Sequence, residues 1–201
     1  MSGPTQGFRL IAVGVSAGGL LALRTLVSGL PPGFDIPLAI VQHRSRDSEL
    51  LCDLLQECSR LDVAEASDKE SIAPGRVYVA PPDYHLLVEP GYFALSTDEP
   101  VRFSRPSIDV MFSSAADAYG VDVIGIVLTG ANSDGARGLR KIVDRGGHAI
   151  VQDPATSEVR VMPQSALKAV PEACVLPMEE IAPYLAGIEG RRMPPCRKGA
   201  A

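Results

Sequence analysis

The sequence of 201 residues lacks several features that would indicate a membrane-inserted, secreted or metal-binding protein. No apolar run reaches the roughly 18 residues that a membrane-spanning helix needs, so we expect no direct membrane insertion. Residues 1–7 do not pair a basic segment with an apolar one, so no signal peptide is visible and a cytoplasmic location is expected. The four cysteines form no CxxC or Cys/His pattern. We therefore expect no metal site and interpret the thiols as buried or incidental in a reducing compartment.

Positive charge is also scarce. The 19 basic residues are outnumbered by 24 acidic ones, and the net charge of −5 argues against nucleic acid as a main partner. Tryptophan is absent, while the 46% of hydrophobic residues is ordinary for a soluble globular protein. A chain of this length forms one domain most simply. We expect that domain to span residues 8–188, with residues 1–7 and 189–201 as flexible termini.

Short apolar runs alternate with helical patterns along the chain. Strands are expected at 8–13, 37–42, 63–66, 123–128 and 148–152, and helices at 20–30, 48–59, 107–119, 135–145, 163–169 and 179–187. This alternation predicts an α/β fold, a doubly wound, mainly parallel sheet with helices on both faces. A turn at Pro90-Gly91 predicts a β-hairpin insertion near residues 76–97.

A glycine-rich turn, Gly14-Val15-Ser16-Ala17-Gly18-Gly19, follows the first apolar run. A strand that ends here and a helix that begins near Leu20 would hold the Ser16 hydroxyl at the carboxyl end of a buried strand. Helix N–H groups at such a point can stabilise an oxyanion, so the turn suits a serine nucleophile. The alternative is a strand–turn–helix corner with a capping serine. The turn is not GxGxxG and has no Walker lysine, which disfavours dinucleotide or nucleoside triphosphate binding.

Two further polar residues follow apolar strands in the same way. His43 comes after the run 38–42 and Asp134 comes shortly after the run 123–128. Because ligands bind outside the carboxyl ends of strands in such sheets, Ser16, His43 and Asp134 are expected at one edge. His43 would take the Ser16 proton and return it to the leaving group, and Asp134 would fix the imidazole tautomer.

Structural roles remain open for these residues at this point. His43 on its own is compatible with a purely structural histidine. Asp134 precedes a helix and is compatible with an N-cap that also orients His43. The other two histidines compete poorly as the base. His85 lies in the hairpin insertion and suits packing or turn hydrogen bonds, whereas His148 begins a strand and should lie at the opposite edge of the sheet.

The order of these motifs resembles the catalytic domain of CheB, the chemotaxis protein-glutamate methylesterase. The resemblance rests on 14–19, on Val41-Gln42-His43, and on Leu128-Thr129-Gly130 with Asp134-Gly135-Ala136. Further matching blocks are Ile72-Ala73-Pro74-Gly75, Val77-Tyr78-Val79-Ala80-Pro81, His85-Leu86-Leu87-Val88, Arg105-Pro106-Ser107-Ile108-Asp109, Gly146-Gly147, Gln152-Asp153 and Met162-Pro163. The similarity covers roughly residues 8–188.

The resemblance implies a triad of Ser16, His43 and Asp134 that works without a cofactor, with oxyanion donors at Ala17 and Ala131. The implied reaction is hydrolysis of γ-glutamyl methyl esters on the cytoplasmic helices of chemoreceptors, with release of methanol. Deamidation of particular receptor glutamines would use the same acyl-enzyme. Arg44, Arg46 and Arg105 are candidates for contact with the acidic receptor surface, although solvated surface charge is the simpler interpretation of each. The alternatives are a non-catalytic module that binds a receptor or signalling partner, and a small-molecule serine esterase.

The sequence departs from the family pattern in three respects. The family carries an N-terminal receiver domain, whereas only residues 1–7 precede the first expected strand here. We therefore expect no phosphorylation control in cis, with activity either constitutive or governed by a separate receiver or signalling protein. The family loop Thr-Gly-Met-Gly-x-Asp has Ala131 and Asn132 at its third and fourth positions here, and Arg44 follows His43 in place of an apolar residue. A positive φ at Asn132 would cost strain.

Overall fold

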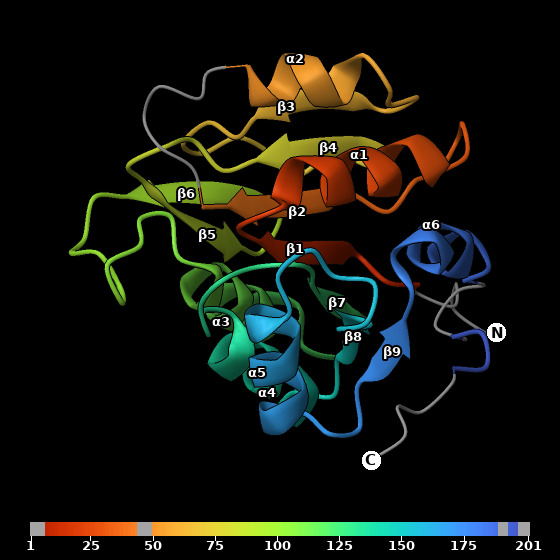
Figure 1. The fold of residues 1–201 in the computed structure, drawn as a ribbon. Helices are drawn as coiled ribbons and strands as arrows, with labels where there is room; N and C mark the ends of the chain where they lie inside the picture. Colours follow the sequence, from red (N-terminus) through yellow and green to blue (C-terminus); the bar gives the residue numbers. More distant parts are fainter. Residues whose placement is uncertain (1–6, 44–49, 189–192, 197–201) are drawn as a thin grey trace, which may run out of the picture.

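A central sheet of seven parallel strands organises the molecule (Figure 1). The computed structural model describes residues 7–43, 50–188 and 193–196. The sheet order is β3-β4-β2-β1-β7-β8-β9. The strands are β1 (Leu10–Val15), β2 (Leu38–Gln42), β3 (Asp62–Glu65), β4 (Arg76–Val79), β7 (Val123–Val127), β8 (His148–Gln152) and β9 (Cys174–Leu176). The helices are α1 (Gly19–Gly29), α2 (Leu51–Gln56), α3 (Ile108–Tyr119), α4 (Ala136–Asp144), α5 (Val161–Ala169) and α6 (Met178–Ala186).

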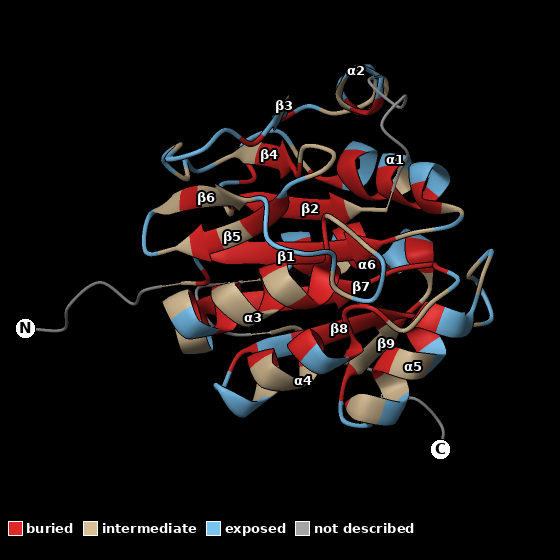
Figure 2. Ribbon diagram, turned by 90° about the vertical axis from the view of Figure 1, so that its left-hand side faces the viewer, coloured by how far each residue is buried: buried red, intermediate tan, exposed pale blue. Residues whose placement is uncertain are grey.

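Helices cover both faces of the sheet because its strands are apolar on both faces. Along β1, Ile11 and Val13 join a core cluster that also contains residues of α1, α2 and α6. Leu10 and Ala12 point the other way, into a cluster with residues of α3, α4 and α5. Figure 2 shows the central strands buried and the exposed positions gathered on the outer sides of the helices. The prediction of a doubly wound parallel sheet is confirmed.

The strand order of the sheet reverses at β1: β2, β4 and β3 lie on one side of it, and β7, β8 and β9 lie on the other. Strand β1 pairs with β2 on one side and with β7 on the other, and Gly14 is in register with both Val41 and Val127. The carboxyl ends of these three strands therefore meet at one edge. In doubly wound sheets this reversal point is where ligands bind, because the two crossover connections leave in opposite directions and open a crevice.

The β-hairpin insertion is smaller than expected. It consists of β5 (His85–Glu89) and β6 (Tyr92–Ser96) around the turn at Gly91, where φ is 91°. The expected boundary near residue 76 is wrong, because Arg76–Val79 forms β4 inside the main sheet, between β2 and β3. Its residues Val77, Tyr78 and Val79 are all fully buried, as expected for a parallel strand covered on both faces.

The cysteines are not all incidental. Cys174 of β9 and Cys196 form a disulfide with a Cα–Cα distance of 5.7 Å, within the ordinary range for such bonds. The Tyr184 hydroxyl also donates to the Pro194 carbonyl oxygen at 3.0 Å. The interpretation of buried or incidental thiols is therefore wrong for this pair, which no sequence spacing marks. The remaining residues expected to be flexible, 1–6, 189–192 and 197–201, lie outside the described residues.

Two smaller expectations concern the helices. The helix expected at 48–59 is shorter in the structure, where α2 covers Leu51–Gln56 and residues 57–59 form a turn and its exit; residues 48 and 49 lie outside the described part of the chain. Among the described helices, none has the length and apolar character required to cross a bilayer.

Candidate active site

Ser16 occupies the sharp turn between β1 and α1. Its N–H donates to the Thr129 carbonyl oxygen at 3.0 Å, and its own carbonyl oxygen accepts the Gly19 N–H at 2.9 Å. Gly18 has a φ of 74°, which glycine adopts without strain. The turn thus fixes a half-buried serine at the edge of the sheet, and within the described residues its Oγ has no hydrogen-bond partner.

The loop after β7 packs directly on this turn. Thr129, 1% exposed, donates its hydroxyl to the Ala17 carbonyl oxygen at 2.9 Å. A Cβ on the next residue, Gly130, would lie 2.9 Å from the Ser16 Cβ and 2.6 Å from the Met162 Cε. Only glycine therefore lets the two loops approach this closely. The loop is fixed to β8 as well, because the Thr129 N–H donates to Gln152 Oε1 at 2.8 Å.

His43 and Asp134 are brought together at the same edge. His43 Nε2 and Asp134 Oδ2 are 2.9 Å apart, with side chains 13% and 1% exposed. The His43 N–H continues the sheet pairing by donating to the Val15 carbonyl oxygen at 3.1 Å, one residue before Ser16. The imidazole is thereby held beside the serine turn by its backbone and beside the carboxylate by its ring.

The Asp134 carboxylate sits at the N-terminus of α3. It accepts the N–H groups of Ile108 at 2.7 Å and Asp109 at 3.0 Å, together with the Ser107 hydroxyl at 3.0 Å. Burial acts to raise the pKa of Asp134, but the hydrogen bonds from His43 and from these N–H groups outweigh it and hold the pKa below its usual value. Asp134 is therefore a carboxylate that fixes the Nε2–H tautomer of His43.

The interpretation of Asp134 as a helix N-cap is correct, but the helix that it caps differs from the one expected. The residue does cap a helix, but that helix is α3, which lies earlier in the chain than Asp134. The helix that follows, α4, has Gly135 as its N-cap, with a φ of 90° and no side-chain cap. Capping and orientation of His43 are consequently combined in one carboxylate, because its two oxygens point toward both the helix and the imidazole.

The two other histidines have structural positions. His85 is 2% exposed, its Nδ1 accepts the Ser107 N–H at 3.1 Å, and its Nε2 lies 3.2 Å from the Glu99 carbonyl oxygen. Its predicted role in turn hydrogen bonds is confirmed, and through Ser107 it supports the start of α3. His148 pairs in register with Ile124 at the amino end of β8, at the opposite edge of the sheet, and burial lowers its pKa.

Asn132 is the residue whose contacts sequence reasoning missed. Its Oδ1 accepts the Asp134 N–H at 3.0 Å, and its Nδ2 lies 3.1 Å from His43 Nδ1. The expected strain is absent, since Asn132 is not among the residues with positive φ. An asparagine two positions before an aspartate is a signal for a local Asx turn. It does not reveal that the second side-chain atom reaches a histidine 89 positions away.

Ala17 and Ala131, the residues expected to supply oxyanion donors, are both exposed. Ala17 follows Ser16 directly, and Ala131 follows Gly130, whose Cα packs against the serine. Neither the Ala17 N–H nor the Ala131 N–H donates a hydrogen bond within the described residues. Free N–H groups beside a nucleophile are the kind of donors that an oxyanion hole requires. The site therefore combines a hydroxyl, an imidazole paired with a carboxylate, and two available backbone donors.

Comparison with known proteins agrees with this geometry. The sequence model of the CheB methylesterase family matches residues 11–185. The chain belongs to the CheB methylesterase family. A putative protein-glutamate methylesterase/protein-glutamine glutaminase from Leptospira interrogans is 49% identical over 179 residues, covering 88% of this chain and 93% of the relative. A protein-glutamate methylesterase/protein-glutamine glutaminase from Carboxydothermus hydrogenoformans is 40% identical over 188 residues, covering 90% of this chain and 55% of the relative.

A solved structure of the same family is similar throughout. The crystal structure of the Thermotoga maritima CheB methylesterase catalytic domain has a TM-score of 0.85 and 32% sequence identity, and the match covers 89% of this chain and 97% of that one. The chain spans about half the length of the Carboxydothermus relative, against nearly all of the Leptospira one. The family resemblance inferred from the motifs is confirmed.

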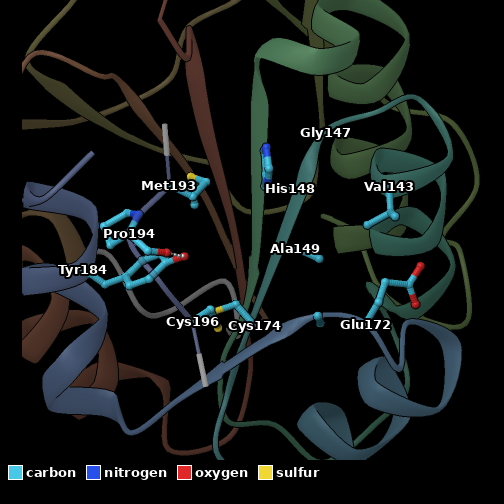
Figure 3. A pocket seen from close by; sticks show the side chains of 11 residues that line it. Val143, Gly147, His148, Ala149, Glu172, Cys174, Tyr184, Met193, Pro194 and Cys196 are labelled. Carbon is cyan, nitrogen blue, oxygen red and sulfur yellow. Dashed lines mark hydrogen bonds between the residues drawn. A yellow bond between two sulfur atoms is a disulfide. The ribbon is translucent and has the colours of Figure 1, made fainter. Parts of the chain in front are cut away.

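Two cavities are relevant here: one lies away from the candidate site and the other lies beside it. One of about 360 Å³ is found at the amino edge of the sheet, where His148, Tyr184 and the Cys174–Cys196 disulfide line it (Figure 3). Another, of about 340 Å³, includes Gly18 and Thr129 in its lining and adjoins the serine turn. Ser16, His43 and Asp134 line neither of these cavities. The serine is thus not at the bottom of either one.

Of the three arginines considered for receptor contact, Arg105 lies among the described residues. Arg105 donates from Nη1 to the carbonyl oxygens of Thr97 at 2.8 Å and Asp98 at 3.1 Å, so it closes its own loop. Arg44 and Arg46 lie outside the described residues. Among the described residues no group of three or more His, Cys, Asp or Glu side chains could hold a metal ion.

Proposed function

We propose that this chain is a serine hydrolase that removes methyl groups from γ-glutamyl methyl esters of a protein and releases methanol. The observation that carries the proposal is the His43–Asp134 pair, 2.9 Å apart, beside the Ser16 turn at the reversal point of the sheet. The names of the relatives, protein-glutamate methylesterase/protein-glutamine glutaminase, support the same reaction. Deamidation of glutamine side chains is the proposed second reaction.

The first half of the reaction acylates Ser16. Because His43 Nε2 is engaged by Asp134, the lone pair of the neutral ring lies on Nδ1. Ser16 Oγ attacks the ester carbonyl carbon while its proton passes to Nδ1. The tetrahedral oxyanion accepts hydrogen bonds from the Ala17 and Ala131 N–H groups. The imidazolium then protonates the methoxide oxygen, the carbon–oxygen bond breaks, and methanol leaves.

The second half restores the enzyme. Nδ1 takes a proton from water, the resulting hydroxide attacks the acyl carbon, and the proton returns to Ser16 Oγ as the glutamyl carboxylate departs. A glutamine substrate follows the same path with ammonia as the leaving group. The ionised Asp134 stabilises the imidazolium at each stage, and its low pKa keeps it charged.

A protein substrate fits the surroundings of the serine better than a small one. Exposed apolar side chains occur on the elements around the site: Leu21 lies on α1 and Val161 at the start of α5. Phe103 is also exposed, and its neighbour Arg102 donates a hydrogen bond to Ser133 in the loop that carries Asp134. Exposed apolar groups around a polar site suit docking to a protein. We propose chemoreceptor cytoplasmic helices as that protein and the cytoplasm as the location.

The first experiment measures methanol release from methylated chemoreceptor membranes. Ser16→Ala should fold normally and lose activity on the order of 10⁶-fold, because the nucleophile is removed. Ser28→Ala is the matched control, since Ser28 is an exposed serine near the end of α1, the helix that follows the Ser16 turn. Full turnover by Ser16→Ala would refute the mechanism. If a fluorophosphonate probe labels Ser16 but no methanol is released, the result would instead indicate a small-molecule esterase or another protein substrate.

A further inference from the structure

The base of the proposed triad is already occupied in this structure. The imidazole makes two ring hydrogen bonds, one from Nε2 to Asp134 Oδ2 at 2.9 Å and one at Nδ1, 3.1 Å from Asn132 Nδ2. Asp134 is ionised and accepts only, so Nε2 carries the ring proton. Nδ1 is therefore the acceptor, and the Asn132 carboxamide donates to it.

The orientation of the Asn132 side chain is fixed by a second contact. Its Oδ1 accepts the Asp134 N–H at 3.0 Å. Turning the amide over would bring Nδ2 against that N–H and Oδ1 against the lone pair of Nδ1, which replaces two attractive contacts by two repulsive ones. The carboxamide thus bridges the carboxylate loop and the base, and Ser16 Oγ is left without a hydrogen-bond partner in the described part of the chain.

We propose that Asn132 is a positioning residue that holds the lone pair of His43 Nδ1 in the resting protein and releases it when Ser16 is acylated. This proposal rests on the function proposed above, since it concerns the same base. Once Nδ1 has taken the serine proton it is a donor, and it can no longer accept from the Asn132 amide. The amide must turn away before or during proton transfer, which its half-exposed position permits.

The size of the effect follows from the bond that must break. A neutral hydrogen bond of this kind has a modest net strength, so releasing it slows acylation by roughly 2- to 10-fold. A donor to the lone pair also favours the neutral ring over the protonated one. Among described residues, Asp134 is the charged side chain in hydrogen-bond contact with the ring, and Asn132 makes the other ring contact.

Two variants separate this role from a purely structural one. Asn132→Ala removes both contacts of the side chain. Asn132→Asp keeps an oxygen for the Asp134 N–H and hence the local turn, but it replaces the donor to Nδ1 with a carboxylate oxygen. If the residue serves only the turn, Asn132→Asp should behave as the wild type and Asn132→Ala should be impaired. If it holds the lone pair, the opposite ranking is expected.

The test uses a fluorophosphonate probe, which needs no receptor substrate. Ser16 Oγ forms a bond to phosphorus, fluoride leaves, and the serine proton passes to Nδ1. Asn132→Ala should label roughly 2- to 10-fold faster than the wild type at pH 8. Asn132→Asp should label more slowly at pH 7, with the acidic limb of its pH–rate profile moved to higher pH. Gln164→Ala removes an exposed carboxamide elsewhere and is the matched control, and Ser16→Ala gives the background.

A second readout observes the ring itself. In ¹⁵N NMR spectra of the wild type, His43 Nδ1 should appear as an unprotonated acceptor, and Asn132→Ala should move its resonance toward that of a free acceptor nitrogen. An unchanged resonance in Asn132→Ala, or labelling rates that rank Asn132→Asp with the wild type above Asn132→Ala, would overturn the proposal. Absence of methanol release affects neither readout, so failure of the proposed function is recognised separately.

Discussion

At the scale of single residues, Asp134 accounts for more of the site than any other side chain. Its carboxylate accepts hydrogen bonds from His43, from Ser107, and from the N–H groups of Ile108, Asp109 and Gly135. A carboxylate at the start of a helix is also stabilised by the partial positive charge there. One residue therefore joins the loop after β7, the N-terminus of α3 and the imidazole of His43.

The low pKa of Asp134 makes folding stability depend on pH. The pKa in the folded protein is below the value of about 3.9 expected in the unfolded chain. The stabilisation is therefore fully present above about pH 4 and is lost as the pH falls through the folded pKa. Asp134→Asn cannot accept all these bonds and should be less stable than the wild type at pH 7. The gap should narrow as the pH falls below about 4.

Urea unfolding of the wild type and Asp134→Asn at pH 7, 5, 4 and 3 measures this gap. Asp98→Asn is the control, because Asp98 is exposed and lies in the loop before α3. A gap that stays constant down to pH 3 would contradict the assignment of a depressed pKa to Asp134.

At the scale of elements, the segment between β6 and α3 presents an aromatic side chain next to the site. Val101 and Ser104 exchange backbone hydrogen bonds of 3.1 and 3.0 Å, and the two residues between them, Arg102 and Phe103, have φ values of 50° and 66°. Left-handed backbone at non-glycine residues is strained and is often retained where function requires it. Arg102 fixes the turn to Ser133 Oγ at 2.8 Å, so the fully exposed Phe103 is held near the loop that carries Asp134.

Phe103→Ser should separate protein substrates from small esters. Loss of an aromatic anchor at an interface weakens binding by about 1 kcal/mol or more, which lowers kcat/KM for methylated receptor membranes by roughly fivefold or more. Hydrolysis of p-nitrophenyl acetate should be unchanged, because the fully exposed Phe103 side chain takes no part in the hydrogen bonds that hold His43 and Asp134. Val121→Ser is the matched control, since Val121 is 47% exposed just before the amino end of β7. Equal losses with both substrates would argue against a docking role.

At the scale of the whole molecule, the proposed active site and the disulfide lie at opposite edges of the sheet. The proposed triad lies beyond the carboxyl ends of β1, β2 and β7, whereas the Cys174–Cys196 disulfide lines a cavity with His148 at the amino end of β8 (Figure 3). Disulfides are uncommon in reducing compartments. If the protein works in such a compartment, its catalytic edge must be independent of this bond.

Reduction should therefore lower stability without lowering reactivity. The bond closes a segment with a sequence separation of 22, for which the chain-entropy relation gives about 3.4 kcal/mol of unfolding free energy. Cys196→Ser, or wild type in dithiothreitol, should unfold at lower urea concentration, and its fluorophosphonate labelling rate should equal that of the oxidised protein. Cys58→Ser is the control, because Cys58 is not part of a disulfide. A labelling rate that falls on reduction would show that the two edges are coupled.

Much of this architecture could be predicted from the sequence, because the strands and turns depend on patterns among neighbouring residues. Apolar runs such as Leu10–Val13 report burial on both faces, and buried parallel strands bring their carboxyl ends to one edge. Ser16, His43 and Asp134 each follow such a run, so the sequence alone predicts that they lie at that edge. The boundary of the insertion was predicted less well, because Arg76–Val79 reads equally as a hairpin strand or an inner strand.

The amino-acid sequence by itself determined the sheet, the glycine turn around Ser16 and the order of polar residues along the catalytic edge. Only the tertiary structure decided that Asp134 caps α3, that Asn132 reaches His43 Nδ1, and that Cys174 meets Cys196. The physical reason is the range of the interactions. Burial and turn preference are properties of neighbouring residues, whereas these contacts join segments 22 to 89 positions apart that meet only after the layers have packed.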